Sequence, residues 1–282
     1  MRQVVGVIDA TMRRGFPGYC VSERAAKTAF LGVAALLFAG SASVTIHWCE
    51  SMAAKGEMPM PGGWAMSMTW MRMPGQTWPG AAASFLAMWV VMMVAMMLPS
   101  LVPMLWRYRQ AVGSAAETRP GWLTTRVGAA YFLVWTACGT VLFPLGAVLA
   151  AAERQLPAVA HAIPMAAAVV VLIAGALQFT AWKARHLGCS QDAPARCRTL
   201  SADAGTAWRH GWRLGVHCAC CSASLMAILL VVGIMDLRMM VLVTAAMVVE
   251  RLAPAGQFVV RTIGVIAMVA GMLLFVRAAG FG

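Results

Sequence analysis

Charged residues are scarce in this chain, and acidic residues are the scarcest. Of its 282 residues, 10 are Asp or Glu and 11% carry a charge, whereas 61% are hydrophobic. The sequence contains no Ser-His-Asp pattern, no glycine-rich phosphate loop and no pair of carboxylates suited to acid–base catalysis, so nothing supports hydrolase or nucleotide chemistry. It also lacks Cys-x-x-Cys-His, which leaves covalent haem attachment unsupported.

The chain contains several long apolar runs. They lie at about 25–46, 79–106, 126–149, 161–182, 213–236, 237–252 and 258–276. Several reach about 20 residues, the length that crosses a bilayer as a helix. Because lipid leaves helices and closed barrels as the only spanning structures, the sequence predicts an all-α, polytopic transmembrane helical bundle with about seven spans. The run 237–252 is short, and if it is re-entrant the number becomes six.

The distribution of basic residues predicts the orientation of the bundle. A net charge of +12 does not indicate nucleic acid here, since no basic patch lies in a soluble domain; in membrane proteins Lys and Arg mark cytoplasmic segments. A cytoplasmic N-terminus places 17 of the 22 Lys and Arg residues inside. We expect a basic cytoplasmic N-terminus (1–24) and one bundle domain (25–282), with a Met-rich external loop (47–78) and a basic cytoplasmic loop (183–213). A signal peptide cleaved near Ala42 is the alternative for the first run.

Four soft-metal ligands fall within five residues at the start of one apolar run: His217, Cys218, Cys220 and Cys221. On a helix His217 and Cys221 share a face, and Cys218 neighbours Cys221. Imidazole and thiolate together suit Cu(I), Zn or an iron–sulfur centre. Cysteines also pack well as small apolar side chains. Because ionisable residues in a membrane are functional candidates by default, we favour metal or redox chemistry.

Methionine is concentrated in two adjoining segments. The loop 47–78 holds Met58, Met60, Met66, Met68, Met71 and Met73, and in the next run Met88, Met92 and Met96 repeat every four residues, flanked by Met93 and Met97. Thioethers bind Cu(I) without losing a proton. The alternatives are an apolar loop anchored at the interface by tryptophans and a helix stripe that only packs the core. The outer end of the first run holds His47, Cys49 and Glu50. We favour a polar cap as their role over participation in a metal-uptake site.

These motifs together resemble a known family. Met88-Trp-Val-Val-Met-Met-Val-Ala-Met-Met-Leu-Pro99, the segment His217–Met226 and Glu250-Arg-Leu-Ala-Pro254 occur in the same order as in the bacterial predicted metal-binding integral membrane protein family, a domain family of unknown function. The likeness covers about 60–276. It implies a polytopic bacterial inner-membrane protein that binds metal, with copper delivery to oxidases as a further expectation. The chain has Ser222 where the family often has Trp, and Asp236 where Asn is usual.

The favoured hypothesis is a membrane protein, more a carrier than an enzyme, that handles or delivers Cu(I). The ion would be taken up by Met66, Met68, Met71 and Met73, passed along Met88, Met92 and Met96, and held by His217, Cys218, Cys220 and Cys221. Zinc, or no metal, remains an alternative. Its partners would be the lipid bilayer, the metal ion and a copper-dependent oxidase or copper chaperone. The rival hypotheses are a membrane thiol–disulfide oxidoreductase using the vicinal Cys220 and Cys221 together with Cys218, and a structural or accessory subunit.

The basic-residue asymmetry gives a testable topology. Reporter domains fused after Met73 and after Ala193 should report opposite sides of the membrane, the first external and the second cytoplasmic. Paired alkaline phosphatase and fluorescent-protein fusions measure this directly. Both fusions on one side would show that the assignment of spans is wrong.

Overall fold

The structure, a computed structural model, describes residues 17–54, 58–59, 65–66, 70, 72, 75–113, 120–185, 203–252 and 256–280. Its helices are α2 (Pro17–Ala54), α3 (Trp78–Gly113), α4 (Pro120–Gln155), α5 (Pro157–Leu177), α8 (Ala204–Val232), α9 (Leu237–Leu252) and α10 (Gly256–Ala278). Two very short strands, β1 (Met58–Pro59) and β2 (Ala65–Met66), pair antiparallel with Met58 opposite Met66. The prediction of a helical bundle is confirmed.

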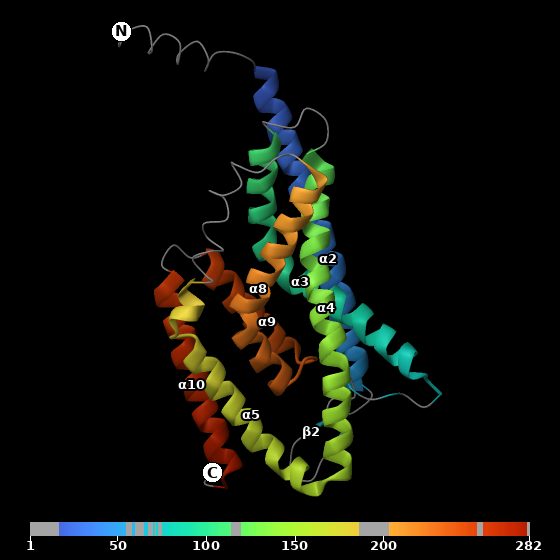
Figure 1. The fold of residues 1–282 in the computed structure, drawn as a ribbon, viewed down its shortest axis with the longest axis vertical. Helices are drawn as coiled ribbons and strands as arrows, with labels where there is room; N and C mark the ends of the chain where they lie inside the picture. The colour runs from blue at the N-terminus through green and yellow to red at the C-terminus, as the bar shows by residue number, and fades with distance from the viewer. Residues whose placement is uncertain are drawn as a thin grey trace.

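Six helices in the described part of the chain are long and apolar enough to cross a membrane: α2, α3, α4, α5, α8 and α10. The helices alternate in direction along the long axis, so that α2 begins at one end of the molecule and α10 finishes at the other (Figure 1). α9 has 16 residues and a length of about 24 Å, less than the hydrocarbon thickness of about 30 Å. It corresponds to the run 237–252 that the sequence marks as short.

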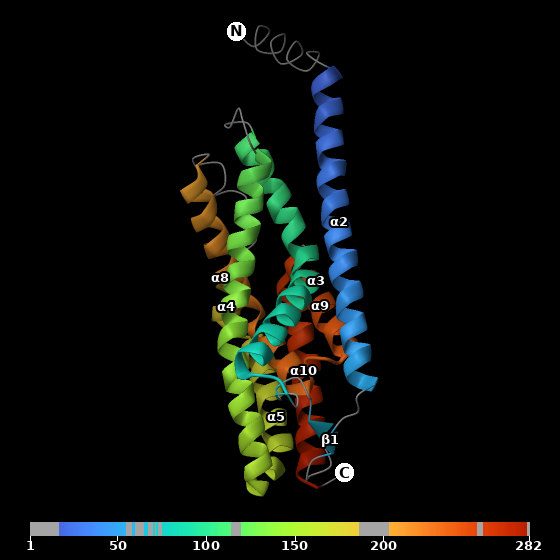
Figure 2. The ribbon, with the colours of Figure 1, turned by 90° about the vertical axis from the view of Figure 1, so that its right-hand side faces the viewer.

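α3 is the central helix of the bundle. In its apolar stretch 61% of the residues are buried, compared with 11% in α2 and 17% in α4. The helices α2 and α4 therefore direct most of their apolar side chains outward, as lipid-facing helices do. Pro99 and Pro103 lie inside α3 and remove backbone hydrogen bonds, which explains the bend of this helix in Figure 2. The methionine stripe therefore lies in the core, where Met92, Met93, Met96 and Met97 are all buried.

Two glycines let α8 approach α4 closely. A Cβ added at Gly211 would clash with the carbonyl oxygen of Val127, and one at Gly215 would lie 3.0 Å from the carbonyl oxygen of Tyr131. Small residues four apart allow this backbone contact between membrane helices. We call His217, Cys218, Cys220 and Cys221 the His-Cys motif; it begins two residues after Gly215. The close approach of the two helices sets the position of this motif along the bundle axis relative to Tyr131 on α4.

The N-terminus of α8 is capped outside the apolar region. The Asp203 carboxylate accepts hydrogen bonds from the Thr206 hydroxyl (2.7 Å) and from the backbone N–H groups of Gly205 (2.6 Å) and Thr206 (3.2 Å). The Thr206 hydroxyl, followed by these amides, lowers the pKa of the Asp203 carboxyl. An anionic cap also complements the helix dipole, so the start of the motif helix is defined by sequence-local interactions.

The glycine contact can be tested with a matched pair of substitutions. Gly215→Ala should lower the free energy of unfolding by about 1–3 kcal/mol, the usual cost of overpacking, because the new methyl group meets Val134 and the Tyr131 carbonyl. Gly32→Ala on α2, with nothing within 4 Å of the added Cβ, is the control. Thermal unfolding in detergent measures both. Equal midpoints for the two variants would contradict the close packing of α4 and α8.

Candidate metal site

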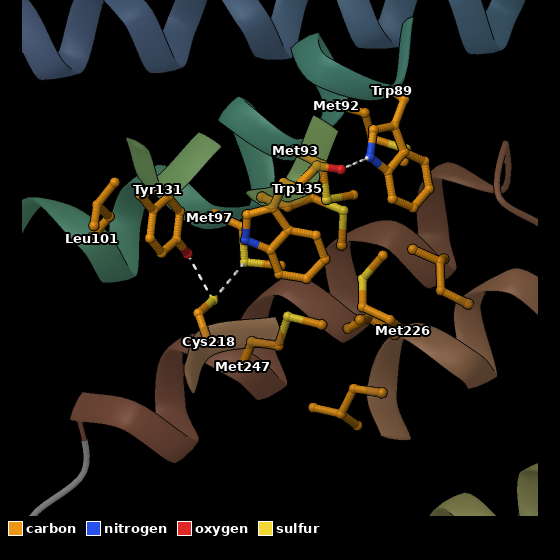
Figure 3. Close-up of a cluster of buried hydrophobic side chains, with 14 of the residues drawn as sticks. Trp89, Met92, Met93, Met97, Leu101, Tyr131, Trp135, Cys218, Met226 and Met247 are labelled. Atoms are coloured by element: carbon orange, nitrogen blue, oxygen red, sulfur yellow. Dashed lines mark hydrogen bonds between the residues drawn. The ribbon is translucent and has the colours of Figure 1, made fainter. Parts of the chain in front are cut away.

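Cys218 is the residue of the His-Cys motif that points into the core of the bundle. Its side chain is buried, and its Sγ lies 2.7 Å from the Tyr131 hydroxyl of α4 and 3.9 Å from Met97 Sδ of α3 (Figure 3). An Arg251 Nη of α9 donates to the same sulfur at 2.8 Å. Side chains from three other helices therefore meet at one thiol on α8.

Several methionines belong to the same buried cluster as this thiol. Figure 3 shows Met93, Met97, Met226 and Met247 directed into the same region as Cys218, and all four belong to the same buried cluster. Methionine fills irregular apolar space well, so packing accounts for much of this cluster. The contact between Met97 and a thiol adds a second property, because it places two soft sulfur ligands side by side.

Arg251 binds the backbone of the motif as well as its sulfur. Its Nη atoms also reach the Cys218 carbonyl oxygen (3.3 Å), the Ser222 hydroxyl (3.4 Å) and the Ser100 hydroxyl of α3 (3.3 Å). Ser222 in turn donates a hydrogen bond to the Cys218 carbonyl oxygen. A guanidinium with several oxygen and sulfur acceptors is well satisfied inside an apolar bundle.

A buried ion pair also contacts the backbone of α8. Lys183 Nζ donates to Glu250 Oε2 at 2.8 Å and to the Cys221 carbonyl oxygen at 2.6 Å, while Gln178 Nε2 donates to Glu250 Oε1 at 3.1 Å. Lys183 and Glu250 are both almost completely buried, with 1% and 3% of their side-chain surfaces exposed. The pair ties the chain beyond α5 to α9 and to the backbone of the motif.

Sequence reasoning missed most of this arrangement. It placed Lys183 at the start of a cytoplasmic loop, and it named Glu250 and Arg251 only as part of a motif that resembles the family. In the structure Glu250 pairs with Lys183, and Arg251 with Cys218. Neighbouring residues on a helix point about 100° apart, so Glu250 and Arg251 reach different partners. The available signal was that ionisable residues inside apolar segments rarely lack a function.

The other motif residues do not gather around Cys218. Cys221 is buried beside Val260 of α10, and His217 and Cys220 are half-buried. Within the described residues, no group of three or more His, Cys, Asp or Glu is placed to hold a metal ion. At about 100° per residue the four motif side chains span about 160° of the helix, so one straight helix directs them to different neighbours. Their role as a joint metal site stays a prediction.

The predicted methionine ligands have different outcomes. Met88, Met92 and Met96 lie in the buried core, but Met97, which the sequence analysis treated as a flanking residue, is the one that contacts Cys218. Met66 lies in β2, where only the backbone is described, and Met68, Met71 and Met73 lie outside the described residues. Uptake by the Met-rich loop therefore stays a prediction.

Part of the chain matches the sequence model of a known protein family. Residues 86–274, more than half of the chain, match the sequence model of the PpoB2 family, described as a copper chaperone. The matched range contains Met97, Tyr131, Cys218 and Arg251. No curated protein and no solved structure matches the chain.

The buried Lys183–Glu250 pair predicts a specific pattern of stability. Lys183→Met should cost about 3–5 kcal/mol, because Glu250 is left as an uncompensated buried charge. Glu250→Gln, added to Lys183→Met, removes that charge and should restore most of the loss. Thermal unfolding of the two variants in the same detergent measures the difference. A double variant no more stable than Lys183→Met would contradict the ion pair.

Proposed function

The chain belongs to the PpoB2 family of copper chaperones, and from this premise we propose that it binds Cu(I) inside its helical bundle at Cys218 and Met97 and hands the ion on. Copper is then the cargo of the protein and not a resident cofactor. Six helices are long and apolar enough to span a membrane, which supports a multi-pass membrane protein. The proposed ligands, Cys218 and Met97, are buried side chains of this bundle.

The observation that carries the proposal is the contact between Cys218 Sγ and Met97 Sδ at 3.9 Å. A metal–sulfur bond of about 2.3 Å, the length known for zinc thiolates, separates two sulfur ligands by about 4.0 Å in a trigonal site and about 3.8 Å in a tetrahedral one. The two sulfurs thus already stand at the separation that one ion between them requires. A thiolate with a thioether is a soft donor set, which favours Cu(I) over harder cations.

The polar neighbours of Cys218 suit a site that must also release its ion. In the structure, Tyr131 and Arg251 contact the sulfur at 2.7 and 2.8 Å. Cu(I) binding must therefore compete with these contacts, and ion release restores them. Such competition lowers the free-energy difference between the loaded and empty states, a property that a carrier needs.

The remaining parts of the copper hypothesis extend this core. We propose that the Met-rich loop captures the ion outside, that the α3 methionines lie along its path, and that a copper-dependent oxidase or a second chaperone receives it. Joint ligation by His217, Cys220 and Cys221 together with Cys218 is the alternative form of the site, which the controls below test. We place the protein in a bacterial inner membrane, as the family resemblance implies, with the cytoplasmic N-terminus that the basic-residue distribution favours.

Cu(I) titration of the detergent-purified protein against a chromophoric chelator tests the site. Cys218→Ser should remove one equivalent of bound Cu(I), and Met97→Leu should weaken that equivalent by about tenfold or more, which corresponds to about 1.4 kcal/mol. Cys221→Ser and Met240→Leu alter equally buried sulfurs and should leave binding unchanged. Folding is checked by size-exclusion profile and circular dichroism.

The controls separate the rival hypotheses. Equal loss in Cys218→Ser and Cys221→Ser would contradict the two-sulfur site and favour joint ligation by the whole motif. Unchanged Cu(I) binding in Cys218→Ser, with a reductant-sensitive thiol pair at Cys220 and Cys221, would favour the oxidoreductase instead.

A further inference from the structure

A second thiol–thioether contact lies near the end of α2. Cys49 Sγ is 3.8 Å from Met235 Sδ, although 186 positions separate the two residues in the chain. Cys49 is buried, with 4% of its surface exposed, and Met235 packs against the same buried cluster. The two sulfurs come from different elements, since Cys49 lies on α2 and Met235 lies in the connection between α8 and α9.

Contact with a methionine sulfur distinguishes Cys49 and Cys218 from the other cysteines whose side chains the structure describes. The part of the chain whose side chains the structure describes contains five free cysteines: Cys49, Cys138, Cys218, Cys220 and Cys221. Within that part, only Cys49 and Cys218 contact a methionine sulfur, at 3.8 and 3.9 Å. Both distances agree with the separation of about 3.8–4.0 Å expected for two sulfurs that share one ion. The family match begins at residue 86, so it does not include Cys49.

The surroundings of Cys49 differ from those of Cys218 in charge. The carboxylates of Glu50 and Asp236 are close enough to act electrostatically on the Cys49 thiol, whereas Cys218 faces the Arg251 guanidinium. Asp236 is held in place by the backbone N–H groups of Arg238 (2.8 Å) and Met239 (3.2 Å), which donate to its Oδ1. Glu50 and Asp236 are exposed. Exposed carboxylates attract a cation to this end of the bundle.

The pair lies near the C-terminal end of α2, next to strand β1 of the Met-rich loop. The connection from α8 to α9 reaches the C-terminal end of α2, and β1 lies just beyond that end (Figure 2). Cys49, the α3 methionines and Cys218 all belong to one continuous cluster of buried side chains. An ion bound at Cys49 is therefore separated from Cys218 by a sulfur-rich interior and not by lipid or by a polar layer.

We propose that Cys49 and Met235 form a second Cu(I) site, which receives the ion at the α2 end of the bundle and supplies it to Cys218 and Met97. This inference rests on the proposed function. Binding replaces the proton of the Cys49 thiol by Cu(I), and departure of the ion returns a proton to the sulfur. The copper stays Cu(I) throughout, so transfer is an exchange of ligands with no electron lost or gained. The carboxylates of Glu50 and Asp236 favour arrival, and the deeper site retains the ion.

The test uses the full-length protein in detergent and Cu(I) itself as the probe. The wild type should bind two equivalents, Cys49→Ser one, Cys218→Ser one, and the double variant none. In the Cys218→Ser background, Met235→Leu should weaken the remaining equivalent by about tenfold, or about 1.4 kcal/mol. Cys138→Ser and Met272→Leu, which alter a cysteine and a methionine elsewhere in the bundle, should each leave both equivalents in place.

X-ray absorption at the copper edge adds a readout that folding defects do not imitate. The Cys218→Ser protein loaded with one equivalent should show a sulfur shell at about 2.3 Å, and Cys49→Ser added to it should abolish that shell. One equivalent in the wild type, lost in Cys218→Ser and kept in Cys49→Ser, would overturn the second site and leave the proposed function intact. Binding unaffected by either cysteine would overturn both.

Discussion

Two adjacent residues near the end of α9 hold the motif helix in place from inside the membrane. Glu250 pairs with Lys183, which also binds the Cys221 carbonyl oxygen, and Arg251 contacts both the sulfur and the carbonyl oxygen of Cys218. Buried charges are costly unless every one is paired and hydrogen-bonded. The short helix α9 can therefore dock in only a few ways, and the way it docks sets the environment of Cys218.

Close packing supplies the rest of the geometry. Gly211 and Gly215 bring α8 against α4, so that Tyr131 reaches the Cys218 sulfur. The bend of α3 at its prolines and the burial of its methionines bring Met97 to the same sulfur. None of these contacts requires a polar cavity. The resulting site places two buried sulfurs beside the Tyr131 hydroxyl and the Arg251 guanidinium, and sulfur ligands are the ones that a soft cation prefers.

Much of the fold follows from the sequence because hydrophobic length is a strong signal in membranes. The helices, the short run at 237–252 and the prolines of α3 could all be predicted. The site could be predicted only in part. The spacing of His217, Cys218, Cys220 and Cys221 shows which atoms are near in the chain, but neighbouring helices decide which of them meets a partner. Met97 rather than Met96, and Lys183 as the partner of Glu250, depend on tertiary packing that no local pattern specifies.

The central claim is that Cu(I) lies between Cys218 and Met97, and locating the metal in the folded protein tests it most directly. An anomalous difference map, recorded at the copper edge from crystals of the Cu(I)-loaded protein, would place the ion without reference to any variant. The account predicts a peak within bonding distance of both Cys218 Sγ and Met97 Sδ, with the Arg251 guanidinium moved off the sulfur. A peak bound by His217 and Cys221, or no peak within reach of Cys218, would contradict it.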